Sequence, residues 1–186
     1  MPRGKLTKDD WIEAGLNTLV KKSIDSVRVE LMAKQFKVTR GSFYWHFESR
    51  QDWLNQILGR WRETATKTVI QRFDYECMSA ADILNQLATL PYHGDSAQRA
   101  ADIELAIRAW ARRDESARRF VDEVDEERMH FLTELFRRIS HSVEDAGSKA
   151  FIFYSLLLSE SLIKYDKDIY EKSNRIQYII DQVLTQ

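Results

Sequence analysis

The amino-acid sequence predicts an all-α fold. With two prolines and six glycines in 186 residues, the chain has few positions that interrupt a helix. Apolar residues recur three and four positions apart along most of its length, whereas the strict alternation typical of half-buried strands is hard to find. Ser or Thr also stands three positions before Asp where several of these apolar patterns begin, as in N-terminal helix caps.

The first third of the chain predicts three helices and the start of a long fourth one. Thr7 and Asp10 form a capping box before a helix over about residues 8–22. Apolar residues at helical spacing predict a short second helix, and a tight connection then leads into a short third helix. Ser49 and Asp52 repeat the capping pattern before the fourth helix. Helix, helix, short turn and helix is the outline of a helix-turn-helix module.

The rest of the chain predicts a larger helical bundle. Ser79 and Asp82 cap a short helix, Asp114 caps a later one, and Gly147 fits the break before another. Together these patterns give about nine helices in all. The later helices cover about residues 80–89, 97–112, 116–140, 148–165 and 167–184.

Cysteine content and hydropathy predict a cytoplasmic protein. The single cysteine, Cys77, cannot form an internal disulfide, and no Cys or His spacing fits a metal site. Residues 1–8 are basic and polar and lack the apolar core of a secretory signal. The most apolar stretch, residues 151–158, is far shorter than the roughly 20 residues that cross a bilayer. We therefore expect no membrane segment, no metal and no cofactor.

The formal net charge of −1 conceals an uneven distribution. Residues 1–72 carry 14 Lys and Arg against 8 Asp and Glu, a net charge of +6. Residues 73–186 carry 14 against 21, a net charge of −7. A local basic excess is what phosphate binding requires of a small module in an otherwise acidic protein. The basic part is also the part with the helix-turn-helix pattern.

The run from Thr39 to Phe47 is the most informative stretch for function. A short helix here buries Val38, Phe43 and Phe47 on one side. Few packing cores place many aromatic and hydrogen-bonding side chains on an outward face, so we expect this helix to enter a DNA groove. The outward residues are Arg40, Ser42, Tyr44, Trp45 and His46. For Trp45 and for His46, each taken singly, packing against the fourth helix is the alternative to DNA contact.

A longer pattern, in fixed order and spacing over residues 8 to about 60, consists of Ala14, Leu16, Leu19, Ile24, Met32, Ala33, Val38, Thr39, Arg40, Gly41, Ser42, Phe43, Tyr44, His46, Phe47, Arg50 and Leu54. With these residues the chain resembles the TetR family of bacterial transcriptional repressors. The resemblance implies a helix-turn-helix DNA-binding domain over residues 1–50, or about 8–60 with the start of the linking helix. The long fourth helix then joins a helical effector-binding and dimerisation domain over residues 51–186.

The resemblance also implies roles in DNA binding. Arg40 is expected to contact a base edge, and Tyr44 and His46 to contact phosphate. Trp45 would pack on sugar or a thymine methyl group, and Arg50 would hold a phosphate at the helix N-terminus. The other expected contributors are Ser42 in or beside the groove, Thr39 as helix cap, Gly41 for close approach, and Arg28 and Lys5 as charges near phosphate.

Two positions depart from the family pattern. Lys37 stands in the turn where the family usually has glycine, and a non-glycine residue in the left-handed conformation costs about 1–2 kcal/mol. We therefore expect a slightly altered turn. Arg28 and Val29 occupy the start of the second helix, where the family tends to place Ser or Thr. Here the charge of Arg28 stands in for a hydroxyl contact to phosphate.

Beyond residue 70 the resemblance implies an unidentified small-molecule effector and a homodimer. Trp61, Trp110 and His130 are candidates for a pocket, although such residues are more often packing residues. Two apolar helices near the C-terminus predict a four-helix interface between two copies, with a monomer that buries them internally as the alternative. The candidate interface residues are Phe151, Tyr154, Leu158, Ile176, Ile180 and Val183.

The sequence thus predicts a sequence-specific transcriptional regulator, a ligand-responsive repressor that binds a palindromic double-stranded operator as a homodimer. The sign of regulation depends on operator position, so activation is also open. A helical adaptor that no longer reads DNA is one alternative, supported only by the two departures. A small helical enzyme is another, but the acidic run at residues 122–127 is typical of a solvated face, and no Ser/His/Asp grouping is visible.

Overall fold

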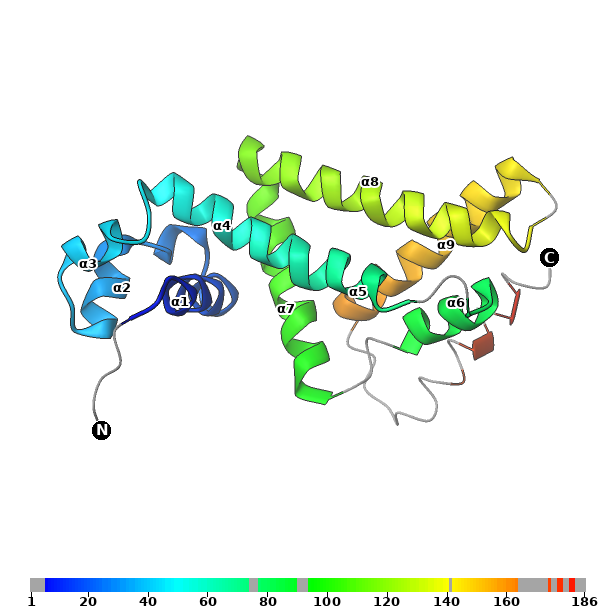
Figure 1. The fold of residues 1–186 in the computed structure, drawn as a ribbon, viewed down its shortest axis with the longest axis horizontal. Helices are drawn as coiled ribbons and strands as arrows, with labels where there is room; N and C mark the ends of the chain where they lie inside the picture. The colour runs from blue at the N-terminus through cyan, green and yellow to red at the C-terminus, as the bar shows by residue number, and fades with distance from the viewer. Residues whose placement is uncertain are drawn as a thin grey trace.

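The computed structural model describes residues 6–73, 77–89, 94–140 and 142–163, together with positions 174, 177–178 and 181–182. These residues form helices and no strand, which confirms the all-α fold. None of the described helices is both long enough and apolar enough to cross a bilayer. In chain order the elements are α1 (Lys8–Lys21), η1 (Ile24–Ser26), α2 (Val29–Phe36), α3 (Arg40–Tyr44), α4 (Arg50–Arg62), η2 (Glu63–Lys67), α5 (Thr68–Gln71), α6 (Ala80–Thr89), α7 (Gly94–Ala111), α8 (Glu115–Arg137) and α9 (Val143–Leu162) (Figure 1).

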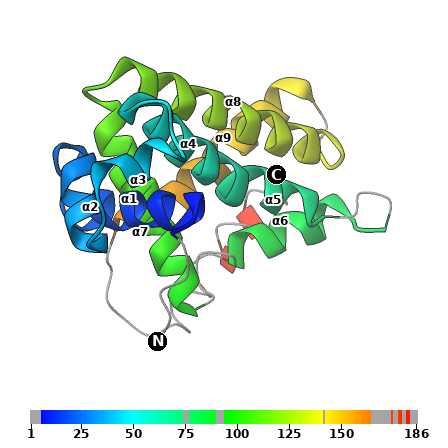
Figure 2. The same ribbon diagram turned by 60° about the vertical axis from the view of Figure 1, so that its left-hand side comes forward.

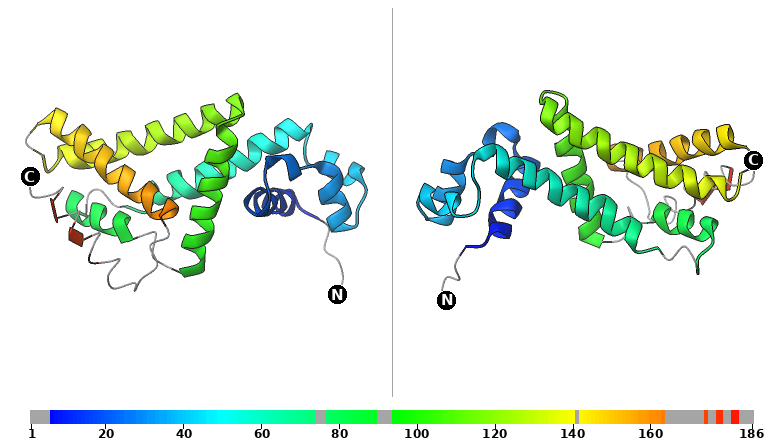
Figure 3. Two further views of the ribbon diagram at one scale, coloured as in Figure 1. Left: turned by 180° about the vertical axis from the view of Figure 1, so that it is seen from behind. Right: turned by 45° about the horizontal axis from the view of Figure 1, so that its top comes forward.

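The helices form an elongated molecule. Helices α1, α2 and α3 gather at one end, and α4 leads from them into the larger bundle (Figure 1). There α8 and α9 lie side by side, as the view from behind also shows (Figure 3). Helix α7 connects the two ends because it contacts both α1 and α8 (Figure 2). The third helix is therefore attached to the bundle through α1 and α4.

Most of the helix starts follow the predicted caps. Thr7 and Asp10 make both hydrogen bonds of the capping box, and the Asp114 side chain accepts from the Ala117 amide at 2.8 Å. The prediction for Gly147 is wrong, because this residue lies inside α9. The helix begins at Val143, where the Ser142 side chain accepts from the Asp145 amide. The helix predicted over residues 167–184 falls largely outside the described residues.

The long fourth helix extends from Arg50 to Gln71 with one irregular turn. Ser49 caps it by accepting from the Asp52 amide at 3.1 Å. After Arg62 the helix widens into the π-helical turn η2 and continues as α5. Single π turns inside α-helices occur frequently at functional sites. The sequence pattern did not indicate this turn.

The turn before the third helix keeps the left-handed geometry. Lys37 has φ 59° and ψ 41°, the only positive φ of a non-glycine residue among the described positions. The Lys37 amide donates to the Lys34 carbonyl and the Val38 amide to the Ala33 carbonyl, as in a Schellman motif. The expectation of an altered turn is therefore wrong. These two hydrogen bonds close the end of α2 despite the conformational cost at Lys37.

Two apolar cores hold the chain together. The first contains Trp11, Phe43 and Trp53 and continues into α7 and the first half of α8 through Ile107 and Val124. The second joins α6, α8 and α9. Full burial of a large apolar side chain contributes about 1.5–3 kcal/mol. Because the first core includes residues of α7 and α8, α1–α4 are packed directly against the bundle.

Gly15 marks a close approach of α1 to α4. A Cβ at this position would lie 2.5 Å from Ile57 Cδ1 and 2.9 Å from Trp53 Cζ2. Contacts this short require the two side chains to move. At Gly59, on α4, a Cβ would meet nothing within 4 Å. The two glycines thus serve as a matched pair for testing the packing.

We predict opposite effects for alanine at these glycines. Gly15→Ala should lower the free energy of unfolding by about 1–3 kcal/mol, because it overpacks the contact with Trp53. Gly59→Ala should raise it by about 0.5–1 kcal/mol, because alanine has the higher helix propensity and the site is open. Urea unfolding followed by circular dichroism measures both. Stabilisation by Gly15→Ala would contradict the close packing of α1 on α4.

Candidate functional site

The third helix is held in place by an aromatic cluster. Phe43 and Phe47 are buried beneath it, with 4.9 Å between their ring centroids. Phe43 also meets Trp11 of α1 at 5.3 Å and Trp53 of α4 at 5.4 Å, both edge to face. Such aromatic pairs contribute about 0.5–1.5 kcal/mol beyond their burial. The predicted inward position of Phe43 and Phe47 is confirmed, whereas Val38 is only half-buried.

The opposite face of α3 and the residues after it are open to solvent. Trp45 is 88% exposed and Tyr44 is 58% exposed, although aromatic side chains are usually covered. Arg40 is exposed as well, while Ser42 and His46 are half-buried. The structure thus brings these five predicted residues together on one end of the molecule.

Thr39 and Gly41 lie at the start of the same helix. Thr39 occupies the N-cap position, but its side chain makes no capping hydrogen bond, so that part of its predicted role is wrong. A Cβ at Gly41 would meet only Thr39 Oγ1, at 3.5 Å, which is ordinary contact. Packing within the chain therefore does not require glycine at this position. Lys5 lies outside the described residues.

Arg40 is held by an ion pair with the second helix. Its Nη1 lies 3.1 Å from Glu30 Oε1, and both side chains are largely exposed. The pKa of the Glu30 carboxyl is lowered, first by a hydrogen bond from the Glu30 backbone amide and then by the hydrogen bond from Arg40. Exposed pairs of this kind contribute little to stability, because water and salt screen them. The Arg40 guanidinium is therefore oriented but can readily exchange its partner.

Arg28 and Arg50 use part of their hydrogen-bonding capacity within the chain. Arg28 Nε donates to the Asp25 carbonyl at 2.7 Å. Arg50 Nε donates to the Val27 carbonyl at 3.0 Å, and its Nη2 donates to the Ile24 carbonyl at 3.4 Å. Arg50 thus ties the start of α4 to the segment before α2. Arg50 itself remains exposed at the surface.

The three candidate pocket residues do not converge on one cavity. Trp61 is buried at the end of α4, and its Nε1 donates to Glu104 Oε2 at 3.1 Å. Trp110 is buried in the first apolar core. His130 is exposed on α8 and lines a shallow, open groove together with Arg62. Trp61 alone contacts the polar cluster described next.

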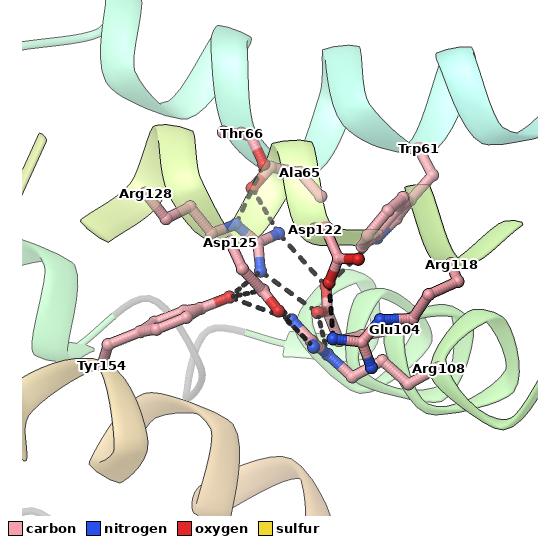
Figure 4. A network of polar contacts seen from close by, with 10 residues as sticks. All are labelled: Trp61, Ala65, Thr66, Glu104, Arg108, Arg118, Asp122, Asp125, Arg128 and Tyr154. Atoms are coloured by element: carbon pink, nitrogen blue, oxygen red, sulfur yellow. Dashed lines mark hydrogen bonds and ion pairs between the residues drawn. The ribbon is translucent and has the colours of Figure 1, made fainter. Parts of the chain in front are cut away.

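A buried polar cluster joins α4 and η2 to α7, α8 and α9 (Figure 4). At its centre the Arg128 guanidinium forms a two-pronged pair with Glu104, at 3.1 Å on each side. Its Nε donates to Thr66 Oγ1 at 2.9 Å, and Nη2 donates to the Ala65 carbonyl at 3.2 Å. The side chains of Arg128 and Glu104 are only 14% and 10% exposed.

Tyr154 of α9 completes the cluster. Its hydroxyl donates to Asp125 Oδ1 at 2.6 Å and accepts from Arg108 Nη2 at 2.9 Å. Burial, reinforced by the hydrogen bond to Asp125, raises the pKa of Tyr154 to about 12. Burial alone would raise the pKa of Asp125, but the bonds from Arg108 and Tyr154 outweigh it and lower that pKa. The cluster therefore holds paired charges and a neutral phenol.

Sequence reasoning did not identify this cluster as functional. Arg128 falls at helical spacing with Val121 and Val124, a pattern that places it on the apolar face of its helix. A charged residue in an apolar stripe was the available signal. Asp125 belongs to the acidic run that was expected to be solvated, yet it is half-buried and bound by Arg108 and Tyr154.

The candidate dimer residues divide into two groups. On α9, Phe151 is 65% exposed and its neighbour Ile152 is 50% exposed, while Leu158 is half-buried. Tyr154 faces the interior instead, because its hydroxyl is taken up by the polar cluster. Leu162, further along the helix, is also exposed. Ile176, Ile180 and Val183 lie outside the described residues.

We predict a specific pH dependence from Tyr154. An unfolded tyrosine titrates near pH 10, so a folded pKa of about 12 means that folding favours the protonated phenol. Its contribution to the free energy of unfolding is complete below about pH 10 and is lost as the pH rises through about 12. Tyr154→Phe should remove this part of the alkaline loss, measured by urea unfolding at stepped pH. The exposed-site variant Tyr44→Phe should retain it, and equal alkaline losses in both variants would contradict the assignment.

Comparison with known proteins agrees with this geometry. The family model described as bacterial regulatory proteins, tetR family, matches residues 12–57. A relative from Bacillus subtilis (strain 168), the uncharacterized HTH-type transcriptional regulator YwcC, is 34% identical over 68 residues. That match covers 37% of this chain and 30% of YwcC, so it spans less than a third of the relative's length.

Solved structures share the fold over nearly the whole chain. A transcriptional regulator from Rhodococcus sp. Rha1 has a TM-score of 0.76 at 13% identity and covers 97% of this chain and 95% of its own. A putative regulator from Saccharomonospora viridis, solved in complex with choline, has a TM-score of 0.76 at 14% identity, with 94% and 95% covered. A putative TetR-family regulator from Rhodococcus sp. has a TM-score of 0.73 at 18% identity, with 95% and 98% covered. Residues 12–57 thus match the TetR family of bacterial regulatory proteins, and nearly the whole chain shares its fold with these solved transcriptional regulators.

Proposed function

We propose that the protein is a ligand-responsive repressor that binds a palindromic DNA operator as a homodimer. The observation that carries the proposal is the outward face of α3, where Arg40, Tyr44 and Trp45 are exposed while Phe43 and Phe47 fix the helix from below. A helix presented in this way fits the major groove of B-DNA. Two such helices related by a two-fold axis would read half-sites roughly 34–36 Å apart.

The side chains suggest a division of labour on DNA. Arg40 is the candidate for base recognition, because its guanidinium can bond guanine O6 and N7 after leaving Glu30. Tyr44 and His46 are candidates for phosphate contacts, and Trp45 is a candidate for contact with sugar or a thymine methyl group. The remaining candidates for phosphate or backbone contact are Arg28, Thr39, Gly41, Ser42, Arg50 and Lys5, with Arg50 acting mainly through its charge.

A small-molecule effector is supported by the family and by the bundle. The Saccharomonospora viridis regulator was solved in complex with choline, so a protein of this fold accommodates a small organic ligand. We propose that an effector of this chain acts where α4 meets α7 and α8, near Trp61. A ligand shifts the protein toward another conformation only by the difference between its affinities for the two.

A helical adaptor that reads no DNA is the weaker candidate. Its support was the two departures from the family pattern at Lys37 and at the start of α2. The left-handed turn at Lys37 removes the first of them. The second remains, because Arg28 makes no side-chain capping bond at the start of α2. The exposed aromatic face of α3 favours the regulator.

Selection from random duplex DNA tests the proposal. We expect the purified protein to enrich a palindrome and to bind it as a dimer. Arg40→Ala should weaken operator binding by about 1–3 kcal/mol and relax the preference at one base position of each half-site. Arg28→Ala should weaken binding to all sequences and reduce the salt dependence by about one ion. Fluorescence anisotropy at two salt concentrations measures both effects.

The same selection can also contradict the proposal. Arg118→Ala, on an exposed part of α8, is the control and should bind DNA as the unaltered protein does. Failure to enrich any sequence would favour the adaptor. Unchanged base preference in Arg40→Ala would remove Arg40 from base recognition while leaving the regulator intact.

The homodimer makes a second prediction. Ile152→Glu should convert the dimer into a monomer, because it places a charge in the exposed apolar face that Phe151, Ile152 and Leu162 form on α9. Operator affinity should fall with it. Sedimentation velocity measures the change, with Gln86→Glu on the exposed side of α6 as the control. A dimer that survives Ile152→Glu would place the interface elsewhere.

A further inference from the structure

Arg128 is a fully engaged cation in a position that an apolar residue would normally fill. A guanidinium has five N–H donors in a planar fork. In Arg128 these five donors make five hydrogen bonds, to Thr66, Ala65, Tyr154 and twice to Glu104. The guanidinium carbon also lies 5.7 Å from the Trp61 ring centroid and 5.9 Å from that of Tyr154. The side chain therefore has one defined arrangement.

The partners of Arg128 come from three separate helical segments. Thr66 and Ala65 belong to the π turn of the long helix, and Glu104 belongs to α7. Tyr154 belongs to α9, while Arg128 itself is on α8. Buried ion pairs add little net stability compared with apolar packing, but the loss of one partner is costly. Their directional bonds hold a particular geometry, which apolar contacts at Trp61 alone would not do.

We propose that Arg128 is a positioning residue that fixes the angle between the long fourth helix and the α7–α9 bundle. Its hydrogen bonds to Thr66 and Ala65 hold η2, and we call these bonds the latch. Because η2 continues α4, the latch also sets the placement of α3. With the latch closed, the two recognition helices of a dimer keep one separation. With it open, η2 can shift and the separation varies. This inference rests on the proposed function, because it concerns how the DNA-binding face is placed.

Two substitutions, one at Thr66 and one at Arg128, can break the hydrogen bonds of the latch without removing the buried positive charge. Thr66→Val replaces a buried hydroxyl with a methyl group of similar size and removes the acceptor for Arg128 Nε. Arg128→Lys keeps the positive charge beside Glu104, but an ammonium group cannot reach all four partners at once. Thr64→Val is the matched control, since Thr64 is exposed on the same turn and its hydroxyl bonds only to backbone carbonyls of α4.

Hydrogen–deuterium exchange of the unaltered chain and the three variants is the first test. We expect Thr66→Val and Arg128→Lys to accelerate exchange of the amides at residues 63–68 by about tenfold, with Thr64→Val unchanged. Thr66→Val keeps the measurement usable if Arg128→Lys does not fold. Exchange rates in Thr66→Val equal to those in Thr64→Val would overturn the latch.

Operator spacing is the second test and reports on position rather than stability. The palindrome obtained by selection is varied by inserting or deleting one base pair between its half-sites. The unaltered protein should prefer one spacing by at least about tenfold, and the two latch variants should bind the neighbouring spacings almost equally well. Base preference within each half-site should not change. A spacing preference in the latch variants as sharp as in the unaltered chain would overturn the inference.

The two tests separate failure of the latch from failure of the proposed function. If the unaltered protein selects no palindrome, the proposed function fails, and the exchange measurement still decides whether Arg128 holds η2. If a palindrome is bound but both variants behave as Thr64→Val does, the regulator stands and the latch fails.

Discussion

The placement of the third helix depends on one side chain, Trp53 of α4. Its indole is fully buried, donates to the Trp11 carbonyl of α1 at 3.1 Å and packs edge-on against Phe43 of α3. Gly15 leaves the space that the indole fills. A helix as short as α3 has little stability of its own in water, so its orientation follows from this packing. Any rotation of α4 is therefore transmitted to the exposed face of α3.

The long helix is held in two physically different ways. Near its start the contacts are mainly apolar and aromatic, with the hydrogen bonds of Arg50 and Trp53 added to them. At η2 they are charged and directional, and a buried donor that loses its acceptor incurs a substantial desolvation cost. The first kind keeps α4 attached to α1 and α3, while the second selects its angle against α7, α8 and α9. The end of α4 that continues into η2 therefore lies among charged, directional contacts inside the bundle.

Local signals in the sequence predicted most helix starts and the inward face of α3. Caps such as Thr7 with Asp10 act over three residues, and the burial of Phe43 follows from helical spacing. The missed features depend on distant parts of the chain. Arg128 meets Thr66 and Glu104 across 62 and 24 positions, which no local pattern encodes. The helix break predicted at Gly147 is wrong because α9 already begins after the Ser142 cap, five residues earlier. Gly147 lies within this helix, where a Cβ would meet nothing within 4 Å.

Because Trp45 is exposed, the intrinsic tryptophan fluorescence of the protein can report on the third helix. The chain has five tryptophans, and the other four, Trp11, Trp53, Trp61 and Trp110, are at most 4% exposed. Soluble collisional quenchers reach only an indole at the surface, so the quenchable part of the intrinsic emission arises from the tip of the third helix. The emission of the shielded indoles reports on the interior instead. Occupancy of that tip and integrity of the core can thus be followed in one sample without a label.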